Sequence, residues 1–469
     1  MIHSWPDFKT AYYTSEWIIR LGALAVVPQR RTPAAARSWL LLIFFLPVAG
    51  LLLFLAIGSP NFPAWRKQRF QRLLPYFAKV AEQLKPQTPD LGDAAAIAEL
   101  AHKAGLMPAV GGNQITLIDD YQKAVGHLVA DIDAARHSVS LLVYIFADDA
   151  IGRDVAGALE RAVGRGVACR VMFDPVGSRQ WRRKTLRLLN SAGVEVREAL
   201  PFRLLRRRTR RDMRNHRKLF VIDGRIGYAG SQNMVSQDFR PGVVNRELVV
   251  RVTGPIVASI SAMIESDWTV ETGDSPEEPG PIPEPTGPVQ AHLLPSGPNY
   301  PLEGFETLLV WQLHQARHRV TIVTPYFIPD DRVIGAMCTA AARGVVVDLV
   351  VSAVVDQRLV NLSQSSFYDE LLHAGVRVNL FRDYLLHAKN VSIDGKFAIV
   401  GSSNVDLRSF QLNEEVSLIL YDQPSVAAVE TIQRGYLDAS DQLGLEDWRR
   451  RPALRKLLEN IARLLNSLL

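Results

Sequence analysis

Two segments of the chain repeat the same polar and glycine residues at the same spacing. Residues 216–233 read HRKLFVIDGRIGYAGSQN, and residues 387–404 read HAKNVSIDGKFAIVGSSN. Both contain the pattern His-x-Lys-x4-Asp-x6-Gly-Ser-x-Asn, whereas most of the residues in between differ. Polar residues repeated in register indicate a chemical requirement that occurs twice. We therefore expect one active site built from two halves.

Each copy of the pattern supplies an imidazole, an ammonium group, a hydroxyl and an amide. Transfer at a phosphodiester needs a nucleophile, a proton donor for the leaving alkoxide and positive groups beside the non-bridging oxygens. Two copies supply all three without a metal ion. A lysine acts on phosphate as a point charge, which suits Lys218 and Lys389.

A β-hairpin in each copy would position these groups. His216 and Lys218 are two residues apart, so they lie on one face of an extended segment, and apolar residues follow them. The Asp-Gly pairs at 223–224 and 394–395 lie between apolar runs, which predicts a hairpin turn. The second strand then ends in Gly-Ser-x-Asn. The hairpin therefore returns the serine and asparagine to the end that carries the histidine and lysine.

This doubled pattern resembles the phospholipase D superfamily and, with the apolar N-terminal segment described below, its bacterial cardiolipin synthases. The resemblance implies an α/β fold of two similar lobes with central mixed sheets flanked by helices. It also implies a phosphohistidine intermediate, with no metal and no other cofactor. The reaction implied is transfer of a phosphatidyl group between two phosphatidylglycerol molecules, which gives cardiolipin and glycerol. Phospholipase D-type hydrolysis of a lipid, or less plausibly of a nucleic acid, is the alternative.

The resemblance also implies roles for individual residues. It places the catalytic set at His216, Lys218, Asp223, His387, Lys389 and Asp394. We expect His216 to be the nucleophile and His387 the general acid and then base, although the sequence symmetry permits the reverse. The two aspartates, each at a turn, are expected to support the motif. The expected phosphate ligands are Ser231, Asn233, Ser402 and Asn404.

Two glutamates occupy matching positions after the motif copies. Glu247 lies in NREL and Glu415 in NEEV. Each is a candidate to accept a hydrogen bond from the second ring nitrogen of a catalytic histidine, which would fix its tautomer. Ordinary strand-edge carboxylates are the alternative.

The N-terminal part contains a long uncharged segment from Trp39 to Ile57. Its 19 residues are enough to cross a hydrocarbon core of about 30 Å, so we expect a spanning or hairpin membrane helix there. A second span is expected near residues 12–27, with an interfacial helix as the alternative. More basic residues follow the segment than precede it, which places the catalytic lobes in the cytoplasm. The expected location is therefore the bacterial inner membrane, with a multi-pass topology.

The rest of the chain divides at a segment rich in proline, glycine and glutamate. The expected units are membrane segments 1–62, a connecting segment 63–113, a first lobe 114–271, a linker 272–288, a second lobe 289–445 and a C-terminal amphipathic helix 446–469. The apolar residues of that last helix recur at helical spacing, so it either lies at a membrane interface or packs on the body.

Charge indicates the partners of the protein. The net charge of +6 and pI of about 9.3 favour anionic partners, and the apolar N-terminal segment favours a membrane surface over nucleic acid. An arginine cluster before the first motif copy is expected to hold the site against anionic headgroups: Arg203, Arg206, Arg207, Arg208, Arg210, Arg211 and Arg214. Phosphatidylglycerol is the expected substrate, and the oligomeric state is left open.

Two further features recur in both halves. Tyr144 and Tyr326 precede acidic pairs at the same spacing, and we expect these tyrosines to serve packing more than catalysis, with contact to a headgroup as the alternative. The acidic pairs at 148–149 and 330–331 precede alanine-rich helical segments. Acidic side chains at that position typically cap a helix, so we expect capping in preference to metal binding.

Overall fold

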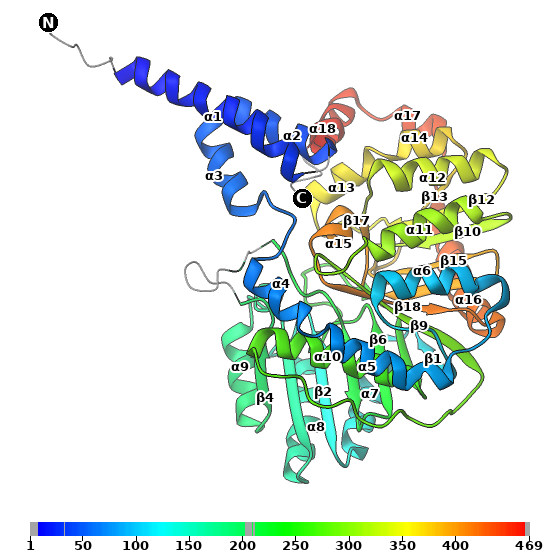
Figure 1. The fold of residues 1–469 in the computed structure, drawn as a ribbon. Helices are drawn as coiled ribbons and strands as arrows, with labels where there is room; N and C mark the ends of the chain where they lie inside the picture. The colour runs from blue at the N-terminus through cyan, green and yellow to red at the C-terminus, as the bar shows by residue number, and fades with distance from the viewer. Residues whose placement is uncertain (1–7, 32, 202–208, 210–211, 465–469) are drawn as a thin grey trace, which may run out of the picture.

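The computed structural model describes residues 8–31, 33–201, 209 and 212–464 (Figure 1). Its body consists of two lobes that repeat one arrangement of strands and helices. The strands of the first lobe are β1 (Val110–Ile118), β2 (Ser138–Val143), β3 (Ala168–Phe173), β4 (Glu195–Glu198), β5 (Leu219–Ile222), β6 (Ile226–Gly230), β7 (Asn245–Arg246) and β8 (Val249–Thr253). Its helices are α7 (Tyr121–Ala134), α8 (Ala150–Gly164), α9 (Arg182–Ser191) and α10 (Ile256–Thr272).

The second lobe repeats this order with additional short elements. Its strands are β9 (Val289–Ser296), β10 (Arg319–Val323), β11 (Phe327–Ile328), β12 (Val346–Ser352), β13 (Arg377–Phe381), β14 (Leu385–Leu386), β15 (Asn390–Ile393), β16 (Phe397–Gly401), β17 (Val405–Asp406), β18 (Glu415–Leu420) and β19 (Ser440–Gln442). Its helices are α11 (Gly304–Gln315), α12 (Asp331–Ala342), α13 (Arg358–Ser365), α14 (Tyr368–His373), α15 (Leu407–Gln411) and α16 (Gln423–Asp438).

One mixed sheet of 15 strands runs through both lobes, in the order β19-β13-β12-β10-β15-β16-β18-β9-β1-β8-β6-β5-β2-β3-β4. From β1 outward and from β9 outward the two halves follow the same order. β1 and β9 pair antiparallel at the centre, whereas β2, β3 and β4, like β10, β12 and β13, pair in parallel. The α/β class with mixed sheets flanked by helices is therefore confirmed. Instead of two separate central sheets, the lobes share one continuous sheet.

A shared hydrophobic core lies under this central junction. It joins Leu219 and Ile260 of the first lobe to Val400 and Val426 of the second, and all four side chains are buried. Each lobe also has its own core, between β2 and the helices α7 and α8 in the first, and between β10 and the helices α11 and α12 in the second. Burial of apolar surface across the junction favours a fixed relative placement of the lobes.

The acidic pairs cap helices, as predicted. The Asp149 carboxylate accepts a hydrogen bond from the Gly152 amide at the start of α8. The Asp330 carboxylate accepts bonds from the amides of Arg332 and Val333 at the start of α12.

Three helices precede the lobes and extend away from them at the upper left of Figure 1. They are α1 (Phe8–Arg30), α2 (Pro33–Phe45) and α3 (Pro47–Ile57). A small core that includes Val27, Trp39, Ile43 and Phe54 holds them together. The connecting segment then forms α4 (Ala64–Gln71), α5 (Leu74–Leu84), two short 3₁₀ turns (Lys85–Gln87 and Gly92–Ala94) and α6 (Ala95–Gly105).

The helix expected from Trp39 to Ile57 is divided at Leu46. Proline cannot continue the hydrogen-bond ladder of a helix, and Pro47 instead begins α3. A Cβ added at Gly50 would lie 2.9 Å from the Ile43 Cα, so glycine permits α2 and α3 to pack closely. Within the described part of the chain, no helix combines the length and apolar character needed to span a membrane. The expectation of transmembrane helices at 12–27 and 39–57 is therefore unsupported by the structure.

Candidate active site

Both motif copies form β-hairpins with a tight turn at the Asp-Gly pair. β5 pairs with β6 around Asp223, and β15 pairs with β16 around Asp394. Asp223 has φ 52° and the following Gly224 has φ 62°, and the second copy has the same conformation. Two consecutive residues with positive φ are typical of the two-residue turn that matches strand twist.

The two aspartates lie at the turn ends of the hairpins and bind backbone amides. The Asp223 carboxylate accepts hydrogen bonds from the amides of Arg136, His137 and Ser138, at the start of β2. Asp394 makes the same three bonds with the amides of residues 317–319 at the start of β10. This geometry suits a structural tie between the hairpin and the neighbouring strand, and neither aspartate lines the pocket described below.

At their other ends the hairpins meet across the seam between the lobes. The His216 amide donates to the Glu414 carbonyl, and the His387 amide donates to the Arg246 carbonyl, both at 2.8 Å. β7 and β14 pair in parallel at the same place. Each histidine is thereby fixed beside the residue that precedes a glutamate of the other lobe.

Each of the two glutamates contacts the motif histidine of the other lobe. The Nδ1 atom of His216 is 2.9 Å from the Glu415 Oε1, and the Nδ1 atom of His387 is 2.8 Å from the Glu247 Oε1. An ionised carboxylate can only accept, so Nδ1 carries the proton and Nε2 remains available for chemistry. Sequence reasoning found both glutamates but did not say which histidine each one contacts.

Burial sets the protonation states of the site. It lowers the pKa of both His216 and His387 to about 4, against the opposing effect of the glutamate carboxylates. Burial also lowers the pKa of Lys218 to about 7 and that of Lys389 to about 8.

The glutamates remain ionised despite their burial. Burial favours the neutral carboxyl group, but the adjacent imidazoles and lysines outweigh it and lower the pKa of both Glu247 and Glu415. At neutral pH the site therefore holds neutral imidazoles and ionised carboxylates. An entering anion would favour the protonated forms of the imidazoles and lysines and so raise their pKa values.

A pocket of about 330 Å³ opens at the seam and receives side chains from both lobes. The two motif histidines and the two motif asparagines line it, together with Tyr144, Arg214, Arg240, Asn245, Tyr326, Gln357, Val360, Asp406, Arg408 and Asn413 among others. One cavity thus brings both copies of the motif together.

The remaining predicted phosphate ligands lie behind this pocket. The Ser402 Oγ donates to the Glu415 Oε2 at 2.5 Å, and the Ser231 Oγ donates to the Leu248 carbonyl at 3.2 Å. Both serines are fully buried and outside the pocket lining. Their hydroxyls hold the strand and glutamate behind the histidines, and contact between these serines and phosphate stays a prediction.

The two motif lysines bind the backbone of their own motif copies. Lys218 Nζ and Lys389 Nζ each donate to the carbonyl of the histidine two residues earlier. Both lysines are buried. The positive charge of these lysines adds to the effect of burial in lowering the pKa of both motif histidines, and neither lysine lines the pocket.

The arginine cluster is only partly within the described residues. Arg203, Arg206–Arg208, Arg210 and Arg211 lie outside them. Arg214 is buried and binds the Asp174 carboxylate and the carbonyls of residues 199 and 200. Its guanidinium thus holds the segment before His216 and also lines the catalytic pocket, and the role of the cluster toward headgroups stays a prediction.

Both repeated tyrosines contact the motif histidines. The ring centroid of Tyr144 is 4.8 Å from that of His216, and the Tyr326 and His387 centroids are 6.4 Å apart, both edge-to-face. Arg240 and Arg408 were missed by sequence reasoning. They follow the Gly-Ser-x-Asn ends by seven and four residues, and that proximity to the motif was the available signal.

Comparison with known proteins places these observations in a family. A family model described as cardiolipin synthase, PLD-like domain, matches residues 128–268 and 309–434. Cardiolipin synthase A of Pectobacterium carotovorum subsp. carotovorum (strain PC1) is 34% identical over 477 residues, covering 97% of this chain and 98% of that protein. Cardiolipin synthase A of Serratia proteamaculans (strain 568) is 33% identical and covers 95% of each chain.

A solved structure supports the fold. The crystal structure of phosphatidylserine synthase from Haemophilus influenzae Rd KW20 matches with a TM-score of 0.59 at 15% identity, over 80% of this chain and 98% of that one. The two-lobed fold and the doubled motif define a phosphatidyltransferase of the phospholipase D type. The chain belongs to the cardiolipin synthase family. The predicted family and enzyme class are therefore confirmed.

Proposed function

We propose that the protein joins two phosphatidylglycerol molecules into cardiolipin and glycerol through a phosphohistidine intermediate. The observation that carries this proposal is the single pocket on which two imidazoles converge, each bound at Nδ1 by a glutamate of the opposite lobe. A transfer in two steps needs one nucleophile and one acid–base group on opposite sides of the phosphorus. The relatives named cardiolipin synthase A support the choice of lipid.

When the phosphodiester anion binds, it raises the pKa of His387 from about 4, and His387 takes up a proton from solvent at Nε2. The neutral His216 then attacks phosphorus through Nε2. The bond from phosphorus to the glycerol oxygen breaks, and His387 gives its Nε2 proton to that oxygen. Glu415 stabilises the positive charge that forms on the His216 ring.

In the second step glycerol has left and the acceptor phosphatidylglycerol enters. The terminal hydroxyl of the acceptor transfers its proton to His387, and the acceptor oxygen attacks phosphorus. The bond from phosphorus to His216 breaks, and the neutral imidazole is restored. Lys218, Lys389 and the amides of Asn233 and Asn404 are proposed to stabilise the charge on the phosphoryl oxygens.

The reaction can be tested with purified full-length protein in vesicles of phosphatidylglycerol, with lipid products measured by mass spectrometry. We expect cardiolipin and glycerol in equal amounts. Phosphatidic acid without cardiolipin would instead establish a hydrolase. The His216→Ala and His387→Ala variants should each abolish transfer, whereas the exposed His318, replaced by alanine, provides the matched control.

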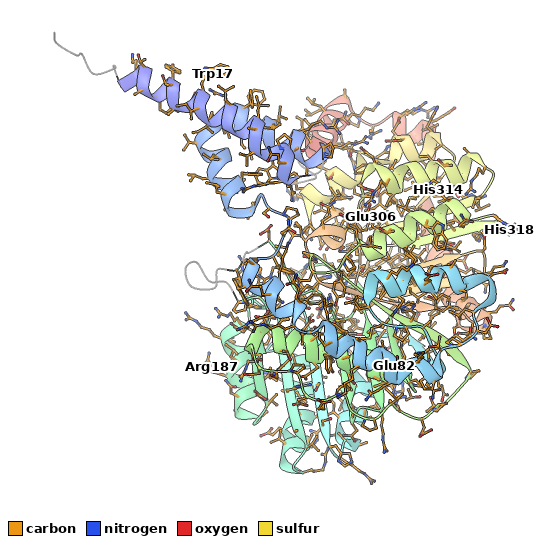
Figure 2. All side chains as sticks on the ribbon, viewed as in Figure 1. Trp17, Glu82, Arg187, Glu306, His314 and His318 are labelled. Atoms are coloured by element: carbon orange, nitrogen blue, oxygen red, sulfur yellow. The ribbon has the colours of Figure 1, made fainter. Side chains whose placement is uncertain are left out.

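Attachment of the protein to the bacterial cell membrane is a further part of the proposal. The three N-terminal helices expose many large apolar side chains, and Trp17 projects from α1 away from the lobes (Figure 2). Among these exposed side chains are Ile18, Leu21, Phe45, Leu52 and Leu55. Exposed apolar surface of this kind indicates an interaction with a membrane or with another protein. Because the proposed substrate is a lipid, a membrane is the favoured partner. We propose that α1–α3 insert into the bilayer and hold the lobes at its cytoplasmic side.

A further inference from the structure

The C-terminal helix α18 (Ala453–Leu464), which follows the short α17 (Leu445–Arg449), packs on the body through its charged face. Glu459 is fully buried and accepts hydrogen bonds from Arg451 at 2.8 Å and Arg455 at 3.1 Å. Arg463 pairs with Glu370 of α14, and its guanidinium lies 4.7 Å from the centre of the Phe367 ring. The Glu459 bonds lie within the C-terminal segment, whereas the Arg463 contacts and the packing of α18 against α13 hold the helix on the body.

The apolar face of the same helix is turned outward. Its large apolar side chains are between 44 and 67% exposed: Leu454, Leu457, Leu458, Ile461 and Leu464. An amphipathic helix on a water-soluble surface has the opposite orientation. Removal of this apolar surface from water would be favourable, so the outward face favours an apolar partner.

The charge around the exposed face indicates which partner fits. Residues 445–464 contain six basic and three acidic side chains, and the basic side chain of Arg450 is 76% exposed. The net positive charge of this segment, beside an apolar face, matches an anionic lipid surface. It disfavours a second copy of the same helix, because two segments of equal positive charge would repel each other.

The position of α18 links this face to the catalytic pocket. α18 packs against α13. Gln357 and Val360 line the catalytic pocket, while the neighbouring Arg358 and Asn361 join Leu454 and Leu458 of the α18 region in lining an apolar groove of about 410 Å³. Residues 357–361 thus line the catalytic pocket with some side chains and the groove beside the outward leucines with others.

We propose that α18 lies in the surface of an anionic bilayer, with its leucines among the acyl chains, and so holds the catalytic pocket against the lipid headgroups. This contact adds a second attachment, separate from α1–α3. The contact itself is independent of the reaction catalysed, whereas its effect on turnover rests on the proposed function.

The contact can be measured without catalysis, in the full-length His216→Ala protein that also carries Cys169→Ala and Cys338→Ala. A fluorophore is attached at Leu458→Cys or, as the matched control on the same helix, at the exposed Asn460→Cys. The vesicles contain phosphatidylglycerol and lipids with nitroxide groups on the acyl chains. We expect nitroxide quenching at position 458 to be at least twofold stronger than at 460, and iodide quenching to be weaker.

Two results would overturn the proposal. Equal quenching by iodide at both positions would place the leucine face in water. Protection of position 458 from both quenchers would place it against protein, such as a second copy of the chain. Neither result depends on which lipid the enzyme converts.

A kinetic measurement tests the consequence for turnover. The Leu457→Ser/Ile461→Ser variant should raise the apparent KM for phosphatidylglycerol in vesicles several-fold and leave kcat unchanged. Turnover of monomeric short-chain phosphatidylglycerol should equal that of the wild type, and Asn460→Ser should have no effect on either. An unchanged KM in vesicles would contradict a role for α18 in lipid access.

Discussion

Each motif histidine owes its orientation to a carboxylate that belongs to the other lobe. Glu415 and Glu247 are buried and ionised, and they accept hydrogen bonds from the Nδ1 atoms of His216 and His387. Ser402, Ser409 and Asn413 also donate to Glu415, so its carboxylate is held from several sides. The residue that prepares a histidine for chemistry is thus encoded far from it in the chain.

Glu415→Gln should lower kcat for cardiolipin formation by about 10²- to 10⁴-fold. The amide NH₂ of glutamine can donate to Nδ1, which moves the ring proton to Nε2 and removes the nucleophilic lone pair. Turnover is measured in phosphatidylglycerol vesicles, with urea unfolding as the check on stability. Glu446→Gln, at a highly exposed side chain just after the same lobe, is the control. A kcat within twofold of wild type would contradict the orienting role.

The lowered pKa values predict that anion binding draws protons into the site. At about pH 7.5, burial leaves Lys218 and Lys389 partly neutral, since it lowers their pKa to about 7 and about 8. A bound dianion favours the charged forms and raises these pKa values, so we expect uptake of about one proton. Titration calorimetry with sulfate, in two buffers of different ionisation enthalpy, measures the uptake. Proton release, or none exchanged, would contradict the prediction.

At the scale of elements, α4 connects the N-terminal helices to the seam through buried charges. The Arg66 guanidinium is buried and contacts Glu271 at the end of α10 and Glu414, the latter at 3.1 Å. Asn215, next to His216, donates to both Asp267 and Glu414. The helix that follows the proposed membrane attachment is thereby joined to the backbone beside both a motif histidine and its glutamate.

Arg66→Met should destabilise the protein by about 3–5 kcal/mol, because it leaves Glu271 and Glu414 buried without their partner. Urea unfolding in detergent micelles measures the loss. Lys67→Met, on the same helix but at a solvent-exposed hydrogen bond, should cost less than about 0.5 kcal/mol. A loss of under about 1 kcal/mol for Arg66→Met would show that the network contributes little to stability.

At the scale of the whole molecule, strand pairing and a shared hydrophobic core join the two lobes, in addition to the linker of the chain. The β1–β9 pairing, the β7–β14 pairing and the shared core all cross the seam. The linker between them, residues 273–288, contains no helix or strand and runs along the body, where the Thr286 amide donates to the Gly112 carbonyl, the Glu277 amide donates to the Glu265 carboxylate and Ile282 packs against the shared core. Continuity of the chain at the linker is therefore not what places the two histidines.

Cutting the linker should consequently leave the enzyme active. A protease site inserted between Ser275 and Pro276, once cleaved, should yield two fragments that migrate together in size-exclusion chromatography in detergent. Cardiolipin formation should stay within about twofold of the uncut protein, because the burial that holds the lobes together is unchanged. Separation of the fragments or loss of turnover would show that the linker maintains the seam.

Much of the local structure could be predicted from the sequence because it depends on near neighbours. The spacing of His216 and Lys218 places them on one strand face, and the Asp-Gly pairs formed the expected turns. The expected helix at 39–57 was wrong in its continuity, since hydropathy measures the apolar character of a segment, whereas Pro47 fixes where a helix begins. The serine hydroxyls bond a strand carbonyl and a glutamate, which the sequence did not indicate, because spacing gives the end of a strand and not the direction of a hydroxyl.

The sequence by itself determined that the chain carries two matching sets of residues suited to phosphate chemistry. It also determined the family to which the chain belongs and the short segments that carry these residues. Only the tertiary structure decided that Glu415 meets His216 across 199 residues and that Glu247 meets His387 across 140. It also decided that α18 turns its charged face inward. The physical reason is that hairpins and turns follow from local backbone preference, whereas partner choice across a seam depends on how both lobes pack.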